Sequence, residues 1–210
     1  MPGSKTDLKK NRIRAFFLTL ETKKKEEKEI SEIQQKAEKE GMTYIQMRLP
    51  VSKITKEFED ALKKKIRENI ISARIREATM DDLETLKELY NKAWLTSNTP
   101  FRPIDVDSME KILRDPDTTI LIAKVYNIEG GFAVLDYEGE EKEIGVIAGL
   151  GVIPRFQRKG LGTVLGMAAW EYFKEAGVKG LRCEVYKDNQ ISYAFIKGIG
   201  FEECGKKVYR

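Results

Sequence analysis

The organisation of this chain is clearest in the segment Val152-Ile-Pro-Arg-Phe-Gln-Arg-Lys-Gly-Leu-Gly-Thr-Val-Leu165. A short apolar strand breaks at Pro154, passes through a basic turn with two glycines, and opens directly into a helix. The first N–H groups of a helix have no partner within the helix, and the helix dipole is positive there, so backbone alone can bind an anion. Gly160 and Gly162 carry no side chains that would keep an anion away, so a phosphate group fits this turn.

Three residues before the glycines add side-chain donors and positive charge, namely Gln157, Arg158 and Lys159. Taken alone the pattern is weak. Glycine makes up about 7% of residues in average proteins, so two glycines at this spacing occur by chance roughly once in a chain of this length. The rest of the sequence therefore has to supply the context.

Composition narrows the possible functions. The 210 residues suffice for one well-cored domain, or for one domain and a smaller unit. The 38 Lys and Arg against 34 Asp and Glu give a net charge of only +4, which disfavours nucleic acid as the main partner. There is no histidine, which excludes histidine-containing metal sites, Ser-His-Asp triads and Cys-His dyads. We expect no metal, and proton transfer by Glu, Asp, Tyr, Lys, Cys or water.

The two cysteines, Cys183 and Cys204, lie in strand-like runs. Without a secretory signal or an apolar stretch of membrane-spanning length, they are expected to be reduced thiols in a cytoplasmic protein that does not enter a membrane. Both are expected to pack as small apolar residues. A homodimer is compatible with the sequence, which does not fix the oligomeric state.

From residue 73 onward, the pattern predicts an α/β domain. A capped helix, a breaker-rich loop and an antiparallel meander come before the basic turn, and a β-α-β unit comes with it. The predicted strands cover residues 73–77, 119–126, 131–137, 143–152, 181–186 and 201–209, and the predicted helices cover 83–94, 108–114, 159–176 and 189–197. A right-handed crossover joins strands 143–152 and 181–186, so these two are expected to be parallel in a mixed sheet.

This order of elements resembles the GCN5-related N-acetyltransferases, the GNAT superfamily. Three features carry the resemblance: the turn Gln157-x-x-Gly160-x-Gly162, the strand Leu181-Arg-Cys-Glu-Val185 followed by Asn189, and the pair Gly200-Phe201 near the end. The resemblance covers residues 73–209, about two-thirds of the chain. It implies a GNAT-type mixed, mostly antiparallel sheet with a parallel β-α-β cofactor crevice, within a domain over residues 71–210.

The resemblance also implies acetyl-CoA as cosubstrate, lying between the two parallel strands with its pyrophosphate on the turn 157–163. The residues then expected to contact it are Leu150, Val152, Gln157, Arg158, Lys159, Gly160, Gly162, Thr163 and Asn189. Glycines within a strand mark bulges or a close backbone approach, so Gly149 and Gly151 predict a bulge that turns an N–H towards the thioester carbonyl. Such an N–H stabilises an oxyanion. A bulge that serves only sheet curvature is the alternative.

Catalysis needs a base, because only the neutral amine attacks the thioester. In family members that acetylate ribosomal-protein N-termini, a Glu in the strand before the Asn is the base, and Glu184 matches that position. The alternative is a strand residue that faces solvent opposite buried Cys183 and Val185.

The usual acid of the family is a Tyr five residues before the Phe of the Gly-Phe pair, and this sequence has Ile196 there. Tyr193 lies one helical turn earlier on roughly the same face and is the candidate replacement. Tyr186 is a second candidate. Three alternatives remain. The thiolate leaves unassisted, it takes its proton from water, or the enzyme is slow.

The resemblance predicts an N-acetyltransferase that acts by direct attack in a ternary complex. Its acceptor is expected to be a primary amine of a protein or peptide N-terminus, a Lys side chain, a polyamine or a small metabolite. The family shapes its acceptor pocket in the loop after the first helix, where Trp94, Phe101, Asp105 and Asp107 lie; the alternative places them in the core and in a helix cap. A catalytically weak CoA-binding sensor or interaction module on the same fold is the alternative function.

Residues 1–70 predict a small β-α-β-α module, with strands over 13–20 and 42–49 and charged helices over 21–40 and 55–69. Residues 37–48 and residues 173–184 show the same order of features: a charged helix end, a glycine cap and a strand. One interpretation is a degenerate half of a tandem acetyltransferase without the CoA turn. The other is an unrelated docking module.

Overall fold

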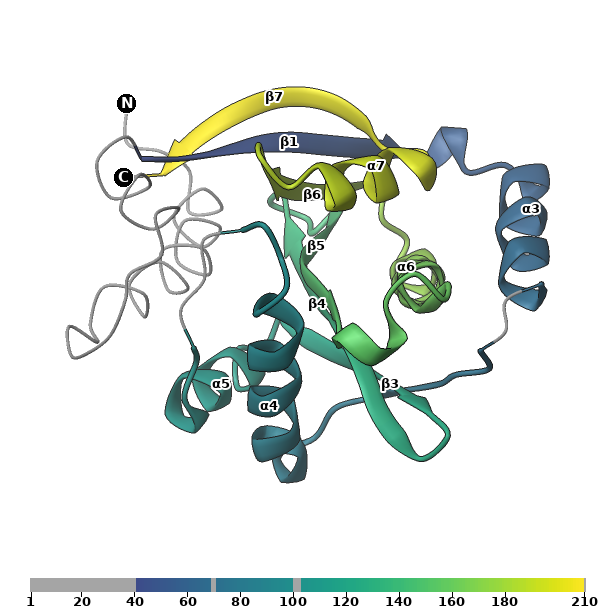
Figure 1. Ribbon diagram of the computed structural model, residues 1–210. Coiled ribbons are helices and arrows are strands. Elements are labelled where there is room, and N and C mark those ends of the chain that lie inside the picture. The colour runs from purple at the N-terminus through teal and green to yellow at the C-terminus, as the bar shows by residue number, and fades with distance from the viewer. Residues whose placement is uncertain (1–40, 69–70, 100–102, 210) are drawn as a thin grey trace.

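The computed structural model describes residues 41–68, 71–99 and 103–209. Figure 1 shows one sheet crossing the molecule with helices on both sides. The strands are β1 (Met42–Pro50), β2 (Arg74–Glu77), β3 (Thr119–Val125), β4 (Ile128–Glu138), β5 (Ile144–Val152), β6 (Gly180–Tyr186) and β7 (Glu202–Tyr209). The helices are α3 (Lys56–Arg67), α4 (Leu83–Trp94), α5 (Val106–Leu113), α6 (Leu161–Glu175) and α7 (Gln190–Gly198).

The strands pair in the order β2-β3-β4-β5-β6-β1-β7. β5 and β6 are parallel, and the other neighbouring pairs of this sheet are antiparallel. This confirms the predicted mixed, mostly antiparallel sheet. Parallel neighbours need a crossover connection, and α6 supplies it between β5 and β6.

Helices cover the two faces of the sheet (Figure 1). Each face has its own apolar core. On one face α6 buries Leu165 and Phe173, both fully enclosed, in a core that includes Leu135 of β4. On the other face α4 and α5 enclose a second core, which includes Leu86 of α4 and Phe132 of β4. Because side chains alternate along a strand, β4 contributes to both cores.

Local sequence sets where the helices begin. Thr55 caps α3 by accepting a hydrogen bond from the Phe58 N–H at 3.3 Å. Asp105 caps α5 in the same way, from the Ser108 N–H at 3.0 Å. A carboxylate or hydroxyl at this position satisfies an N–H that has no partner in the helix. Of the two roles predicted for Asp105, attraction of an amine or helix capping, the structure shows the capping contact.

β1 lies inside the sheet, between β6 and β7. Its partners on β6 run from Tyr44 opposite Tyr186 to Pro50 opposite Gly180. Met47 of β1 is fully buried in the core beneath α6. The prediction of a module over residues 1–70 does not include this pairing, which joins two segments more than 100 residues apart in the sequence.

α3 also packs against the domain that follows it. The carboxylate of Glu59 accepts hydrogen bonds from Trp170 Nε1 at 2.9 Å and from Lys174 Nζ at 2.7 Å, both on α6. Residues 42–67 therefore share the sheet and the core of residues 71–209, so the expected boundary at residue 70 does not separate two sheets. The predicted strand over 13–20 and helix over 21–40 lie outside the described residues.

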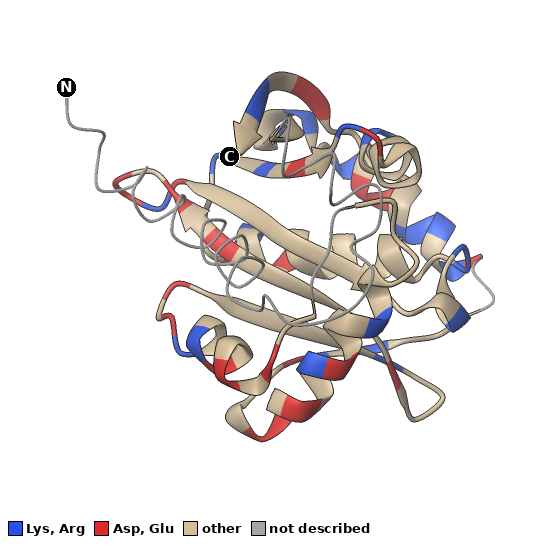
Figure 2. Cartoon of the chain, turned by 60° about the vertical axis from the view of Figure 1, so that its left-hand side comes forward, with Lys and Arg blue, Asp and Glu red and all other residues tan. Residues whose placement is uncertain are grey.

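Charged residues of both signs are interspersed over the helices and the strand ends (Figure 2). This distribution matches the small net charge of +4. In the described ranges, each helix is too short or too polar to cross a lipid bilayer.

Candidate active site

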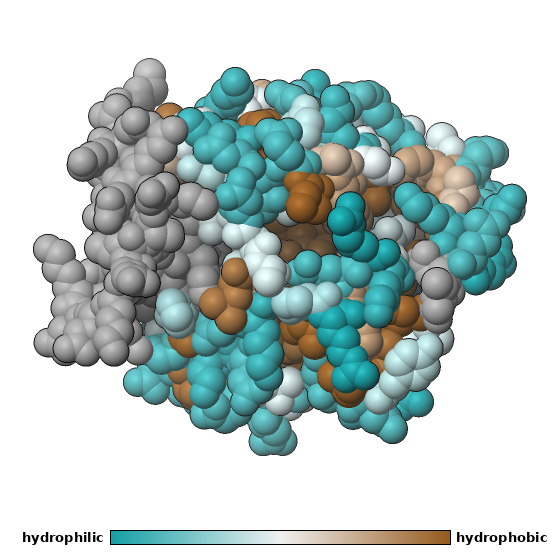
Figure 3. Space-filling view, in the orientation of Figure 1, coloured by the Kyte–Doolittle hydropathy of each residue, from teal (hydrophilic) through white to brown (hydrophobic). Residues whose placement is uncertain are grey.

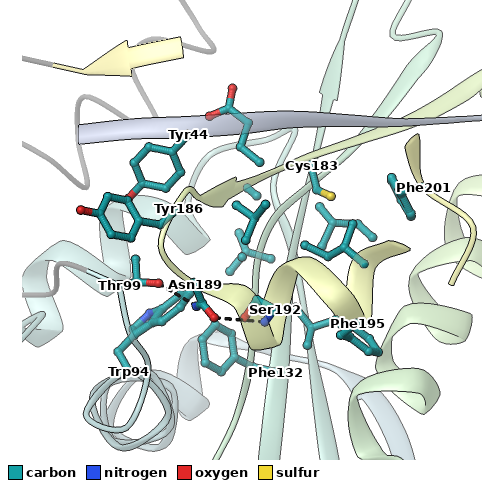
Figure 4. A pocket seen from close by; sticks show the side chains of 18 of the residues that line it. Tyr44, Trp94, Thr99, Phe132, Cys183, Tyr186, Asn189, Ser192, Phe195 and Phe201 are labelled. Atoms are coloured by element: carbon teal, nitrogen blue, oxygen red, sulfur yellow. Dashed lines mark hydrogen bonds between the residues drawn. The ribbon is translucent and has the colours of Figure 1, made fainter. Parts of the chain in front are cut away.

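A crevice opens where the two parallel strands separate. The pairing of β5 with β6 ends at Ile147 opposite Cys183, although β5 continues to Val152 and β6 to Tyr186. A cavity of about 180 Å³ lies in the gap. Figure 3 shows it as a hollow with apolar side chains in the middle of this face, and Figure 4 shows its walls. The aromatic residues around it are Tyr44, Tyr90, Trp94, Phe132, Tyr186, Phe195, Phe201 and Tyr209.

A β-bulge shapes the β5 wall of the crevice. Leu135 of β4 lies opposite Ile147, and the preceding Val134 lies opposite Gly149, so Ala148 is an extra residue in β5. The predicted bulge is thereby confirmed. Gly151 allows the ring of Phe132 to lie close to the β5 backbone, because a Cβ at this position would lie 2.5 Å from that ring.

The bulge and the strand direction leave backbone groups of β5 facing the crevice. Ile153 donates its N–H to the carbonyl of Gly130 on β4 at 2.9 Å, so the backbone groups of Ile153 point towards β4. Backbone groups alternate direction along an antiparallel ladder, so those of Val152 and Leu150 point away from β4 into the gap. This is the side from which an extended ligand can pair with the strand as another strand would.

The half-buried side chain of Gln157 is held by two hydrogen bonds. Its side-chain nitrogen donates to the carbonyl of Val152 at 2.9 Å and to Thr96 Oγ1 at 3.1 Å. These two acceptors use the amide nitrogen, and a contact of this side chain with a phosphate stays a prediction. Gln157 instead fixes the turn relative to the end of β5 and to the loop after α4.

The turn before α6 has the geometry of an anion site. Gly160 caps the helix with φ +86°, a left-handed conformation that suits glycine. Its carbonyl accepts the N–H groups of Thr163 at 3.0 Å and Val164 at 3.2 Å. The N–H groups of Leu161 and Gly162 precede the first intrahelical bond and have no recorded partner among the described residues.

Three positively charged residues lie in the turn that leads to these N–H groups. Arg155, Arg158 and Lys159 are exposed, and none of them forms an ion pair within the part of the chain that the structure describes. Arg158 is left-handed with φ +58°, which sharpens the turn. Thr163 is 7% exposed and its N–H is bound to the carbonyl of Gly160, and its contact with the cosubstrate stays a prediction. The backbone at 161–162 and the cations at 155–159 thus remain available to an anion.

A loop from α4 reaches both walls of the crevice. Asn189 caps α7 by accepting the Ser192 N–H at 3.0 Å, and its Nδ2 donates to Thr99 Oγ1 at 2.8 Å (Figure 4). Asn98 Nδ2 donates to the carbonyl of Asp188 at 2.8 Å. Together with the bond from Gln157 to Thr96, these contacts fasten residues 96–99 to the basic turn and to the β6–α7 connection. Asn189, only 4% exposed, has a structural role here.

Glu184 is the first residue of β6 after the split. Its Oε2 accepts a hydrogen bond from the Tyr209 hydroxyl at 2.8 Å, and its Oε1 accepts one from Gln46 Nε2 at 3.3 Å. The side chain is half-buried and lines both the crevice and a second cavity of about 250 Å³. It is therefore not the plain solvent-facing residue of the alternative interpretation.

Comparison with known proteins identifies this arrangement. The model of the acetyltransferase (GNAT) family matches residues 83–201, more than half of the chain. The chain belongs to this family. As a GNAT acetyltransferase it is an acetyl-CoA-dependent acyltransferase, and the crevice, the bulge and the turn before α6 fit that cosubstrate.

Two curated relatives align with 143 residues each. An uncharacterized N-acetyltransferase of Methanocaldococcus jannaschii is 29% identical over 61% of this chain and 60% of its own length. An aminoglycoside N(6')-acetyltransferase type 1 of Acinetobacter haemolyticus is 27% identical over 64% of this chain and 94% of its own length. The chain thus spans less than two-thirds of the length of the Methanocaldococcus jannaschii relative.

Solved structures share the fold at low sequence identity. The aminoglycoside N-acetyltransferase AAC(6')-Iy, bound to a bisubstrate analogue, superposes with a TM-score of 0.56 at 22% identity, over 66% of this chain and 97% of that one. The PaiA N-acetyltransferase of Thermoplasma acidophilum, in complex with coenzyme A, gives a TM-score of 0.52 at 21% identity, over 66% of this chain and 99% of that one.

The acetyltransferase does not place Tyr193 in its crevice. The Tyr193 hydroxyl donates to the Glu203 carboxylate on β7, and this hydrogen bond raises the pKa of Tyr193. The one-turn spacing from Ile196 brings Tyr193 towards β7, while Ile196 itself lines the cavity. Tyr186, the second candidate, also lines it and is 6% exposed.

Some residues of this acetyltransferase site had no signal in the sequence. Tyr44 and Gln46 lie on β1, and Tyr209 lies at the end of the chain, all outside the segment that the family model matches. Only the pairing of β1 between β6 and β7 brings them to the crevice. In the described ranges, no three residues of the His, Cys, Asp and Glu types are placed to hold a metal ion.

Proposed function

We propose that this acetyltransferase moves the acetyl group of acetyl-CoA to a primary amine of a small molecule, by direct attack in a ternary complex. The observation that carries the proposal is the separation of β5 from β6 immediately before Glu184. That separation puts a carboxylate and a strand with open backbone groups on facing walls of one cavity.

The cosubstrate is assigned to the β5 side of the crevice. Its pyrophosphate sits on the N–H groups of Leu161 and Gly162, with Arg158 and Lys159 beside them. Its pantetheine arm follows β5 and pairs with backbone groups of Leu150 and Val152. The carbonyl of Val152 already accepts from Gln157, so the N–H groups of these two residues are the expected donors.

The chemistry follows from this placement. The amine nitrogen attacks the acetyl carbonyl carbon, and the bulge at Ala148 lets a β5 N–H stabilise the oxyanion that forms. Glu184 takes a proton from the amine, and the C–S bond then breaks to leave an amide and the CoA thiolate. The thiolate takes its proton from Tyr186 or from water, because Tyr193 faces Glu203.

A small acceptor suits the cavities on this face. Glu184 lines both the crevice and the second cavity, which also includes Asp136 and Glu138 of β4. An amine that enters through the second cavity meets the acetyl group at Glu184. A relative of this chain is named an aminoglycoside N(6')-acetyltransferase, which supports a small acceptor with several amino groups.

The test is a screen of amines for release of the free CoA thiol. The full-length chain is incubated with acetyl-CoA and, separately, with sisomicin, glucosamine, spermidine or a peptide with a free N-terminus and a lysine. Thiol release with a small amine, and acetylated product by mass spectrometry, is the expected result. Release with the peptide alone would contradict the small-molecule acceptor.

The same screen tests the second candidate function, a CoA-binding sensor, which is favoured by Ile196 at the position of the usual acid. A sensor binds acetyl-CoA and melts at a higher temperature in its presence, but releases no thiol with any of these amines.

A further inference from the structure

Two residues outside the segment that the family model matches hold the carboxylate of Glu184. The matched segment covers residues 83–201, whereas Gln46 lies on β1 and Tyr209 on β7. Their side chains donate to different oxygens of Glu184, at 3.3 Å and 2.8 Å respectively. We infer that Gln46 and Tyr209 are positioning residues of the acetyl transfer, which orient the carboxylate of Glu184 towards the crevice.

The sheet order explains how distant residues reach this carboxylate. β1 pairs with β6 so that Gln46 lies directly opposite Glu184. β7 pairs with the other edge of β1, with Met42 opposite Tyr209. A strand neighbour directly opposite presents its side chain on the same face, within hydrogen-bond reach. Glu184 thus receives one donor from the adjacent strand and one from the strand beyond it.

Aromatic packing fixes the position of the Tyr209 hydroxyl. The Tyr209 ring is 9% exposed and meets the Tyr44 ring edge to face, with centroids 5.5 Å apart. Tyr44 in turn meets Tyr186 edge to face at 5.7 Å. Such contacts restrict each ring to a narrow set of orientations. The hydroxyl that donates to Glu184 is therefore held at the crevice by a row of three tyrosines from β7, β1 and β6.

Two donors on different oxygens of one carboxylate fix its orientation, so the carboxylate does not rotate away from the amine. A general base has to lie within hydrogen-bond reach of the proton that it accepts, so this orientation matters for the reaction. Because this inference rests on Glu184 as the base of the proposed reaction, its test is chosen to work without an acceptor.

The test is the NMR chemical shift of the Glu184 carboxyl carbon at one fixed, near-neutral pH, in the full-length chain labelled at the glutamate carboxyl carbon and assigned with Glu184→Gln. In Tyr209→Phe, which keeps the ring, this resonance is expected to move, because one carboxylate oxygen loses the donor that lies 2.8 Å away. Gln46→Met, which keeps the length of the side chain, is expected to move the resonance by less, because the hydrogen bond from Gln46 is longer, at 3.3 Å. The matched control is Tyr172→Phe, which removes a hydroxyl bonded to Thr119 Oγ1 at 2.7 Å beneath α6.

An unmoved resonance in both variants would overturn the inference, even if their melting temperatures fell. A change in Tyr172→Phe as large as that in Tyr209→Phe would overturn it as well. With an amine that the enzyme acetylates, Tyr209→Phe is expected to lower kcat by about tenfold and to leave the Kd for acetyl-CoA unchanged. A chain that acetylates no amine but shows the change in the Glu184 resonance would leave the positioning intact and refute only the proposed function.

Discussion

Ile147 of β5 and Cys183 of β6 are the last partners in the parallel pairing of the two strands, and the crevice begins at the residues that follow them. On β6 the next residue is Glu184, and on β5 it is the bulged Ala148. The end of one backbone ladder therefore places a carboxylate and a strand with open N–H groups on facing walls. If the two strands stayed paired to their ends, their backbone groups would bind each other and no crevice would form.

Replacement of Glu184 by Gln is expected to lower kcat by about 10² to 10⁴, the usual contribution of a general base. The side chain keeps its size, so the Kd for acetyl-CoA measured by calorimetry is expected to remain unchanged. The control is Glu203→Gln, which alters an exposed carboxylate on β7. A Glu184→Gln enzyme with the wild-type kcat would remove this residue from the reaction.

Gly160→Ala is expected to weaken acetyl-CoA binding by about tenfold, because an L-residue disfavours φ +86° and the turn that presents the N–H groups is disturbed. Gly177→Ala is the matched control. It lies at the other end of the same helix, is left-handed with φ +73°, and has no atom within 4 Å of the added Cβ. Both variants lose about 1 kcal/mol of stability, but only the first is expected to bind acetyl-CoA more weakly in calorimetry.

Tyr186→Phe and Tyr193→Phe distinguish the two tyrosines proposed as acid from sequence. Tyr186 lines the cavity, so its loss is expected to lower kcat by about tenfold or more if it protonates the thiolate. Tyr193→Phe removes a bond to Glu203 outside the crevice and is expected to leave kcat within about twofold. Equal kcat in Tyr186→Phe and wild type would assign the proton to water. A large loss in Tyr193→Phe would contradict the position described for it.

Met47→Ala tests whether β1 is part of the domain core. Met47 is fully buried, so its truncation is expected to cost about 2 to 5 kcal/mol of unfolding free energy in urea. The neighbouring Arg48 is exposed, and Arg48→Ala is expected to change stability by no more than about 0.5 kcal/mol. A chain starting at residue 71 is likewise expected to lose cooperative unfolding, since β7 loses its strand neighbour. Cooperative melting of that short chain would restore the boundary expected at residue 70.

Stability in acid is expected to depend on Asp82. The Arg76 guanidinium, bonded to both carboxylate oxygens at 2.7 Å, lowers the pKa of Asp82 to about 2. A carboxyl group with a lowered folded pKa stabilises the fold above its unfolded value, near 4, and loses this contribution as the pH falls through about 2. Asp82→Asn is therefore expected to melt at a lower temperature than wild type near pH 6. The difference is expected to shrink between about pH 4 and 2, and a constant difference would contradict the assignment.

Local patterns predicted most elements of the fold, because each depends on neighbours in the sequence. Apolar spacing located α6, the glycines at 149 and 151 located the bulge, and Thr55 located the start of α3. The resemblance of the basic turn to the CoA-binding turn of the family also depends on residues close together in the sequence. Tyr193 is the instructive exception. Helical spacing placed it near Ile196, but β7 provides Glu203 as a partner on the other side.

The sequence by itself determined the fold class, the parallel pair and the glycine turn, since backbone conformation and apolar periodicity are properties of short segments. Only the tertiary structure decided that β1 lies between β6 and β7, and thus that Gln46 and Tyr209 bind Glu184. Strand pairing is a contact between remote segments, and its partner depends on which edge of the sheet is open when the chain folds. No local pattern in β1 carries that information.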